Sequence, residues 1–279
     1  MAYAAFSNGF DGDIVSLNYI LKTLAAKTYI IPGITANPNV TVAADGATAY
    51  YYKRKDSGVG EAKTGDKIDW SAENVTGVYR QAIDMLDCFQ IHDVLPRINV
   101  KSVSADVVGD KVVQDTITVA NSWNKKYIAK LVSGGTAKTY AAALTVDNIY
   151  SVVVGAKATF IKDHVKDYMR PEALIVAPDV MALLKEKNLV LFKDNMPNKS
   201  EKIEGYFDEM AVIEAPDLDA GKFIIMNSLG AGSPLNINTL YVVDGTTAGW
   251  PGSSMISGEF GYGLEICDAT LIHVYSKQS

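Results

Sequence analysis

The sequence has few of the residues that commonly bind metals, form cross-links or act as nucleophiles. Its 279 residues include two cysteines and three histidines. Cys88 and Cys267 lie far apart among apolar neighbours, which predicts two buried free thiols in a reducing compartment. His92, His164 and His273 have no partner ligands at metal-site spacing, so we expect structural roles for all three. No metal and no other cofactor is expected.

Two further absences exclude whole classes of protein. The formal net charge is −6, and the chain lacks the basic stripe of a dedicated nucleic-acid binder, apart from the short run at 53–55. No apolar run approaches the roughly 20 residues of a membrane span. Residues 1–27 lack the basic and apolar segments of a signal peptide. We therefore expect a protein made in the cytoplasm that does not contact a membrane.

Two segments imitate a nucleotide-binding or catalytic motif, but the residues around each of them argue against that function. The glycines of 258–263 imitate a nucleotide-binding loop, but they do not join a strand to a helix, and no Lys-Ser/Thr pair follows. Asp217 and Asp219 could act as paired acids, but they follow Pro216 in a loop and are typical of solvated turns. We expect no catalytic residue, and therefore no enzyme.

The most informative stretch runs from residue 102 to residue 132. Apolar or small residues recur there at steps of three or four, as on one face of a helix: Val108, Val112, Thr116, Val119, Trp123, Tyr127 and Leu131. Gly134 and Gly135 end the run. About 30 residues at about 1.5 Å each make a rod of roughly 45 Å, longer than the core of such a chain needs. The pattern predicts a scaffold element.

The segments before this rod are thin and polar. Residues 1–36 hold one short amphipathic stretch, 14–29, which predicts an arm that lies on another surface. Residues 37–85 predict a hairpin, because β-prone segments flank a charged, glycine-rich tip at 53–67. That tip has too few apolar residues to pack on the chain's own core, so we expect it to contact a neighbouring molecule.

After the rod the pattern changes to alternating helices and strands. A second helix is predicted from Leu144 to about His164, with Thr145 as its N-cap. Its expected buried face comprises Ile149, Val152, Val153, Ala156, Phe160 and Ile161. An apolar strand at 173–177 and a helix that begins at Pro178 follow. Further strands are expected at 210–213, 222–226, 240–243 and 270–275.

This order of elements resembles the HK97-type major capsid proteins of tailed bacteriophages over essentially the whole chain. Four segments are similar to that family in pattern: LTVDNIY at 144–150, RPEALIVAP at 170–178, EGYFDEMAV at 204–212 and FGYGLE at 260–265. The resemblance implies an α+β capsid fold. Its parts would be an N-terminal arm at 1–36, an extended hairpin (E-loop) at 37–85, a peripheral P-domain at 86–170 with the spine helix at about 102–132, an α/β axial A-domain at 171–260, and a return strand to the P-domain at 261–279.

The resemblance also implies a function and partners. The chain would assemble through homopentamers and homohexamers into the icosahedral head around double-stranded DNA, without sequence-specific binding. It would be assembled in the host bacterial cytoplasm and reside in the virion. Because only about 36 residues precede the hairpin and the first is Met1, scaffolding is expected to be a separate protein, beside a portal and, in some relatives, a decoration protein. The alternatives are an encapsulin-like shell around a protein cargo and a soluble α/β enzyme.

The arm and the hairpin supply the expected contacts between subunits. These candidates are Leu17, Leu21 and Leu24 in the arm, and Tyr51, Lys53, Arg54, Lys55, Glu61, Lys63 and Lys67 in the hairpin. The tyrosines at 50–52 beside this basic run could also bind single-stranded nucleic acid. Successive strand residues face opposite sides, which splits that cluster and favours contact with a neighbouring subunit.

Overall fold

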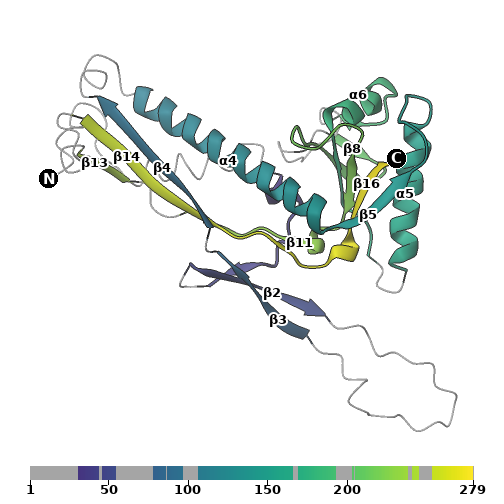
Figure 1. Cartoon of the computed structure of the whole chain (residues 1–279), viewed down its shortest axis with the longest axis horizontal. Coiled ribbons are helices and arrows are strands. Elements are labelled where there is room, and N and C mark those ends of the chain that lie inside the picture. Colours follow the sequence, from purple (N-terminus) through teal and green to yellow (C-terminus); the bar gives the residue numbers. More distant parts are fainter. Residues whose placement is uncertain are drawn as a thin grey trace, which may run out of the picture.

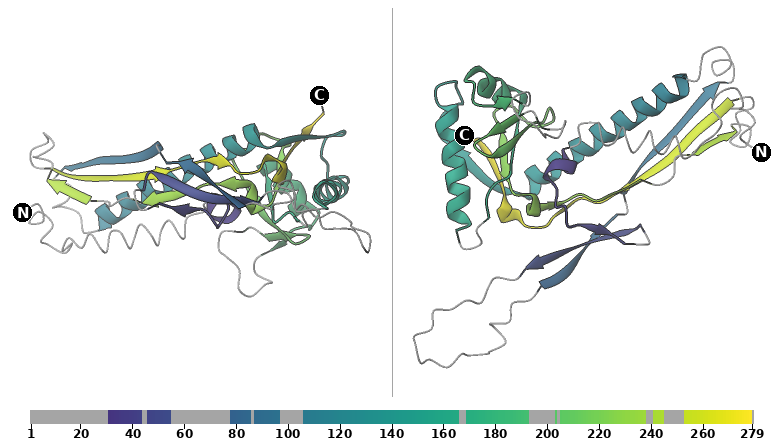
Figure 2. Two further views of the ribbon diagram at one scale, coloured as in Figure 1. Left: turned by 90° about the horizontal axis from the view of Figure 1, so that it is seen from below. Right: turned by 180° about the vertical axis from the view of Figure 1, so that it is seen from behind.

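The computed structural model describes residues 31–43, 46–54, 78–85, 87–96, 106–165, 169–192, 203, 205–237, 241–244 and 253–278. Within these ranges the chain forms two units joined at the end of one long helix, α4 (Figure 1). We call α4 with its strands the elongated unit, and the larger sheet with its two helices the sheet unit. A two-stranded hairpin projects from the junction between them, as Figure 2 shows from behind.

Helix α4 spans Asp106–Gly134 and has 29 residues, so it extends for about 44 Å. It confirms the predicted rod. Trp123, Tyr127 and Leu131 of the predicted apolar face are at most 5% exposed. Ala120 and Ile128 are buried beside them, so the buried face is broader than the predicted stripe.

The elongated unit pairs α4 with a narrow antiparallel sheet. Strand β14 (Ser253–Tyr262) pairs with β4 (Asp87–Pro96) along its whole length, from Ser253 opposite Pro96 to Tyr262 opposite Asp87. The other edge of β14 carries β12 (Leu235–Ile237) and β13 (Tyr241–Asp244). A small core joins helix and sheet: Ala120, Trp123 and Tyr262, with Phe89, Leu235 and Leu264 packed around them.

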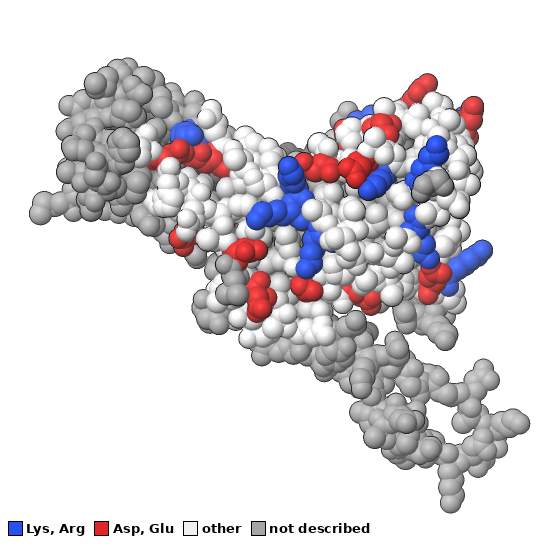
Figure 3. All heavy atoms as spheres, viewed as in Figure 1, with Lys and Arg blue, Asp and Glu red and all other residues white. Residues whose placement is uncertain are grey.

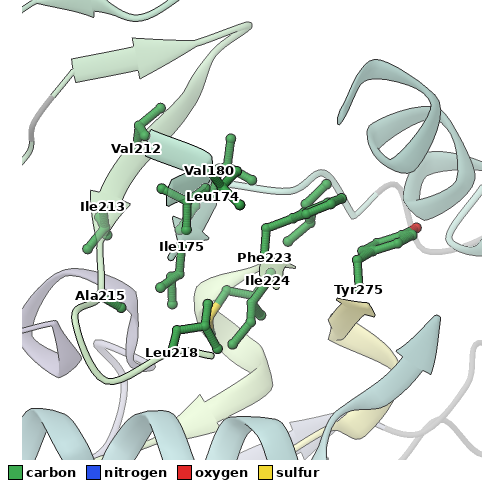
Figure 4. Close-up of a cluster of buried hydrophobic side chains, with 14 of the residues drawn as sticks. Leu174, Ile175, Val180, Val212, Ile213, Ala215, Leu218, Phe223, Ile224 and Tyr275 are labelled. Carbon is green, nitrogen blue, oxygen red and sulfur yellow. The ribbon is translucent and has the colours of Figure 1, made fainter. Parts of the chain in front are cut away.

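The sheet unit is built on seven strands in the order β5-β16-β10-β6-β9-β8-β7. Their bounds are Thr136–Tyr140 (β5), Ala173–Val176 (β6), Leu191–Phe192 (β7), Gly205–Phe207 (β8), Met210–Glu214 (β9), Phe223–Met226 (β10) and Ile272–Lys277 (β16). Helices α5 (Ile149–Asp163) and α6 (Pro178–Glu186) pack on it. Strands β6 and β10 are fully buried and lie at the centre of the core (Figure 4).

Two details of α5 differ from the prediction. The helix begins at Ile149, and its N-cap residue Asn148 makes no side-chain capping bond. The predicted N-cap Thr145 is therefore wrong by three residues, although its carbonyl accepts a hydrogen bond from the Ile149 N–H at 3.0 Å and its N–H donates to Asn148 Oδ1 at 2.8 Å. The buried face is Ile149, Val153, Ala156 and Phe160, whereas Ile161 is 37% exposed. In contrast, α6 begins at Pro178 as predicted.

Strand pairing also corrects the expected boundary at residue 261. The strand that returns to α4 is β14, because it pairs with β4. After Tyr262 the chain leaves the elongated unit, and β16 pairs with β10 and, in parallel, with β5. The expected return strand at 261–279 therefore lies in the sheet unit, together with β5 and α5 of the expected P-domain at 86–170, whereas β14 of the expected A-domain at 171–260 lies in the elongated unit.

The projecting hairpin consists of β2 (Thr48–Arg54) and β3 (Val78–Asp84), which pair in antiparallel register from Thr48 opposite Asp84 to Arg54 opposite Val78. This confirms the predicted hairpin strands, while the tip at 55–77 lies outside the described residues. A separate small core holds the hairpin base: Ala49, Tyr51, Ile83, Met85 and Cys267. A Cβ at Gly232 would lie 2.5 Å from Ile83 Cδ1 and 3.2 Å from Cys267 Sγ, so a larger residue would require these buried side chains to shift.

The small core of the elongated unit gives the first prediction. Trp123 is 5% exposed, so Trp123→Ala should lower the free energy of unfolding by about 3–5 kcal/mol through lost burial and a cavity. Urea denaturation followed by circular dichroism measures this. Ile117 lies on the same helix but is 42% exposed, and Ile117→Ala should change stability by less than about 1 kcal/mol. Equal losses in both variants would contradict the described orientation of α4.

Candidate subunit-interaction surfaces

The end of the N-terminal arm is fixed to α4 by buried polar contacts. Ile31, just before the short helix α2 (Pro32–Thr35), is 1% exposed. Its N–H donates to Asn124 Oδ1 at 2.9 Å. The hydroxyls of Thr35 and Tyr127 form a hydrogen bond at 3.0 Å, and burial raises the pKa of Tyr127. The described end of the arm, from Ile31 to Thr35, is therefore held in a defined position on α4.

The predicted contact residues of the arm cannot be located in this way. Leu17, Leu21 and Leu24 lie outside the described residues. Their role as contacts with a neighbour stays a prediction. The structure locates the residue that follows them: Ile31 is held on α4 by its hydrogen bond to Asn124, and we call this contact the fixed point of the arm.

The hairpin candidates fall into three groups. Tyr51 is 4% exposed and its hydroxyl donates to Gln81, so its side chain packs on its own chain. Lys53 and Arg54 are the last two residues of β2, next to the tip. The remaining candidates lie outside the described residues: Lys55, Glu61, Lys63 and Lys67. The structure brings none of the ten candidates together in a described cluster.

Sequence reasoning missed the outer face of α5. This helix lies at the edge of the sheet unit (Figure 1). Tyr150 is 52% exposed, Ile161 37% and Val165 62%. Between them, a Cβ at Gly155 would meet no atom within 4 Å. Tyr150 and Ile161 belong to α5, whereas Val165 follows its C-cap residue His164. Exposed apolar side chains on a helix that already buries another face depart from the usual polar outer face, and the residue types at 150, 161 and 165 were the available signal.

Charges of both signs alternate over the face shown in Figure 3. Lys130 Nζ lies 3.5 Å from Glu265, Lys138 Nζ 3.0 Å from Asp163, and Lys157 Nζ 2.8 Å from Asp208. Such exposed pairs each contribute about 0–1 kcal/mol and are weakened by salt. Among the described residues, the surface charges therefore adjust stability only slightly, and the apolar cores hold the fold.

One lysine makes a different kind of contact. Lys126 Nζ lies 4.9 Å from the ring centre of Tyr262 and 5.2 Å from that of Phe89, and these two rings stack at 4.5 Å. It also hydrogen-bonds to the Tyr262 hydroxyl. This cation–π contact fixes α4 to β14 and β4 at the edge of their small core.

Two histidines pack between α5 and the seven-stranded sheet, in agreement with the structural role predicted for them. His273 is 2% exposed, and its ring lies 4.9 Å from that of Phe160. His164 Nε2 hydrogen-bonds to the Thr270 carbonyl at 2.8 Å. Burial and the nearby Lys138 lower the pKa of His273 to about 4, although Asp163 lies 3.7 Å from its Nε2. His273 is therefore neutral at pH 7.

The cysteines agree with the prediction only in part. Both are free thiols, as predicted. Cys267 is buried in the hairpin-base core, but Cys88 is exposed in this single chain, so the predicted burial of Cys88 is wrong. Cys88 lies in β4 opposite Gly261 of β14, on a narrow sheet that does not cover every side chain.

No group of three or more His, Cys, Asp or Glu is arranged to hold a metal ion among the described residues. Within the same ranges, every helix is too short or too polar to cross a bilayer.

No family model and no curated protein sequence matches the chain, but solved structures match it over most of its length. A chain from Mycobacterium phage Che8 is 15% identical with a TM-score of 0.59, covering 91% of this chain and 90% of that chain. The capsid of cyanophage P-SCSP1u is 11% identical with a TM-score of 0.60 and 86% coverage of both chains. A virus-like particle from Pyrococcus furiosus is 11% identical with a TM-score of 0.56, covering 94% and 98%.

The buried His273 generates the second prediction. Its pKa of about 4 in the folded chain lies below the ordinary value of about 6.5, so between these values the unfolded chain binds more protons. Stability should therefore fall as the pH drops from about 6.5 to about 4, by up to about 3 kcal/mol from this group. Urea denaturation of wild type and His273→Gln at several pH values measures the difference.

The exposed His92 provides the control for this experiment. His92→Gln should keep the pH slope of the wild type, whereas His273→Gln should have a shallower slope even if it is less stable throughout. Identical slopes for wild type and His273→Gln would show that His273 does not stay neutral in the folded chain.

Proposed function

Because the chain has the HK97-type capsid fold, we propose that it is a major capsid protein, a structural subunit that assembles with copies of itself into a closed shell. The observation that carries this proposal is the match to capsid structures along nearly the whole chain, 91% for the Che8 structure. The match therefore includes the elongated unit and the sheet unit together, and not one common subdomain.

The distribution of packing in the single chain supports the same function. The hairpin base has its own small core, whereas β2 and β3 extend away from both units (Figure 2). Strand β1 (Thr41–Val42) pairs with β2 only at Ala49 and Tyr50, so β2 and β3 form a two-stranded ribbon from Tyr51 onward. Such a ribbon is marginally stable in water at best, and contact with neighbouring subunits would stabilise it. Many such contacts, each weak, act together when a shell closes.

The finer parts of the proposal follow from the family resemblance. Pentamers and hexamers would form an icosahedral head around double-stranded DNA, with a separate scaffolding protein, a portal and in some cases a decoration protein as partners. Assembly would take place in the host bacterial cytoplasm, and the mature location would be the virion. The subunit would contribute structure and no catalysis.

A second candidate is a shell that encloses protein instead of a genome. The match to the virus-like particle from Pyrococcus furiosus, which covers 98% of that chain, fits a closed shell of either kind. Because the two functions use the same fold, particle contents distinguish them.

Electron microscopy of the purified full-length protein tests the proposal directly. We expect capsomers or closed shells by negative stain, and elution ahead of a small oligomer in size-exclusion chromatography. Particles from the natural source should contain nucleic acid, measured as excess absorbance at 260 nm, whereas a protein cargo would support the second candidate. A uniform small oligomer that never forms shells would point to the soluble enzyme alternative.

The charged run beside the hairpin tip gives the third prediction. Replacing Lys53, Arg54 and Lys55 together by glutamate should reduce particle yield most at low salt, because salt screens the ion pairs expected across the interface. Light scattering against ionic strength measures the yield. The hairpin-base core does not involve these residues, so the free subunit should keep its thermal stability.

A matched variant keeps the charge of this run. Replacing Lys53 and Lys55 by arginine should assemble like the wild type at every salt concentration. If the glutamate variant assembles normally, the run does not contact a neighbouring subunit.

The arm provides the fourth prediction. Removing residues 1–30 should impair assembly at all salt concentrations, because apolar contacts from Leu17, Leu21 and Leu24 would not be screened. The fixed point at Ile31 remains in this variant, so the shortened subunit should fold. Normal shell yield from the shortened chain would show that the arm makes no necessary contact.

A further inference from the structure

Two aspartates from different elements meet in the elongated unit. Asp93 belongs to β4, and Asp115 belongs to α4. Lys111, one turn before Asp115, places its Nζ 3.1 Å from Asp93 Oδ2 and 3.3 Å from Asp115 Oδ1. Two carboxylates thus share one ammonium group, which neutralises only one of them.

The environment of Asp115 makes a second negative charge costly. Its side chain is 13% exposed, and its Oδ2 is buried with no donor among the described residues. A buried acceptor without a donor is unfavourable, because it has lost its hydrogen bonds to water and gained none. A proton on one carboxyl would supply the missing hydrogen bond to the other, which is how paired carboxylates at short distance are stabilised.

The expected protonation of the pair agrees with this geometry. Desolvation, together with the hydrogen bond to Asp93 and its charge, raises the pKa of Asp115 to about 6. Desolvation also raises the pKa of Asp93, but its hydrogen bonds with Asp115 and Lys111 outweigh this effect and lower it. The pair therefore changes from one shared proton to none within the range of physiological pH.

The other described groups around the pair are uncharged or face away. Ile256 lies opposite Asp93 on β14. On β4, the next residue, His92, bonds through Nδ1 to Ser257 at 3.1 Å, and Gln90 bonds to Glu259. Alternation along a strand puts Gln90 and His92 on the face away from Asp93. Among the described side chains, Lys111 is thus the charge that opposes the pair.

We propose that Asp93 and Asp115 form a proton-operated latch between β4 and α4. With one shared proton, the carboxyl of one donates to the carboxylate of the other, Lys111 neutralises the remaining charge, and the helix is fastened to the strand. When that proton passes to solvent, two carboxylates face one ammonium, and their repulsion weakens the contact. The latch is a property of the single subunit and does not depend on shell assembly.

The latch predicts a stability change with the opposite sign to that of His273. The folded chain keeps this proton up to a higher pH than the unfolded chain does. Loss of the proton should therefore lower the free energy of unfolding as the pH rises from about 5 to about 7.5. Asp115→Asn places a permanent amide donor where the shared proton would be. Relative to this variant, the unfolding equilibrium constant of the wild type should increase by up to roughly tenfold over that range.

Urea denaturation of the full chain at several pH values tests the latch, with Glu265→Gln as the matched control. Glu265 also lies beside a single lysine, with its Oε2 3.5 Å from Lys130 Nζ, but its side chain is 47% exposed. The free energy of unfolding of its variant should therefore change with pH as that of the wild type does. Asp93→Asn should remove the same pH dependence as Asp115→Asn. If the free energy of unfolding of both aspartate variants changes with pH as that of the wild type does, the latch is overturned.

Carbon-13 NMR of aspartate-labelled full chain gives an independent measurement, which remains informative if a variant fails to fold. One side-chain carboxyl carbon of the wild type should titrate near pH 6, and that transition should be absent from Asp115→Asn. A wild-type spectrum in which every aspartate has finished titrating below pH 5 would also overturn the latch.

Discussion

The structure depends on α4 packing into two cores at once. Near its middle, Trp123 packs with Tyr262 and Phe89 in the elongated unit. One and two turns later, Tyr127 and Leu131 belong to the core of the sheet unit. Because one continuous helix supplies both sets of side chains, the hydrogen-bonded backbone of α4 fixes the two units relative to each other.

The end of α4 makes this connection tight. The helix ends at Gly134, and β5 begins two residues later. A Cβ at Gly135 would lie 2.8 Å from the Ile272 side chain, and one at Gly134 would lie 2.6 Å from Ile266. The two glycines therefore let the helix approach the chain around β15 (Glu265–Ile266) and β16 closely. A larger residue at either position would require these side chains to shift, and at Gly135 it would also lie 2.8 Å from the Leu131 carbonyl.

The arm and the hairpin are attached to this frame at defined points. Asn124 and Tyr127 hold the end of the arm on α4, and the hairpin base packs on Cys267 near the junction. Apolar burial is dense within the two units, whereas the far parts of β2 and β3 extend away from both of them (Figure 2).

The sequence by itself determined the elements whose signals are local. The apolar period of α4, the Pro178 start of α6 and the β-prone strands of the hairpin are all properties of neighbouring residues, and each appears in the structure. The order of these elements also indicated the capsid fold. The predicted start of α5 at Thr145 was wrong, since the helix begins at Ile149. A threonine favours an N-cap by its residue type, but the folded chain does not use it as one.

The tertiary structure alone decided which distant segments meet. The pairing of β14 with β4 and of β16 with β5 joins residues more than a hundred positions apart, so no local pattern reports it. For the same reason the exposure of Cys88, the burial of Tyr51 and the meeting of Asp93 with Asp115 could not be predicted. Burial and charge proximity depend on the packing of whole elements, whereas helix and strand preferences depend on the residues themselves.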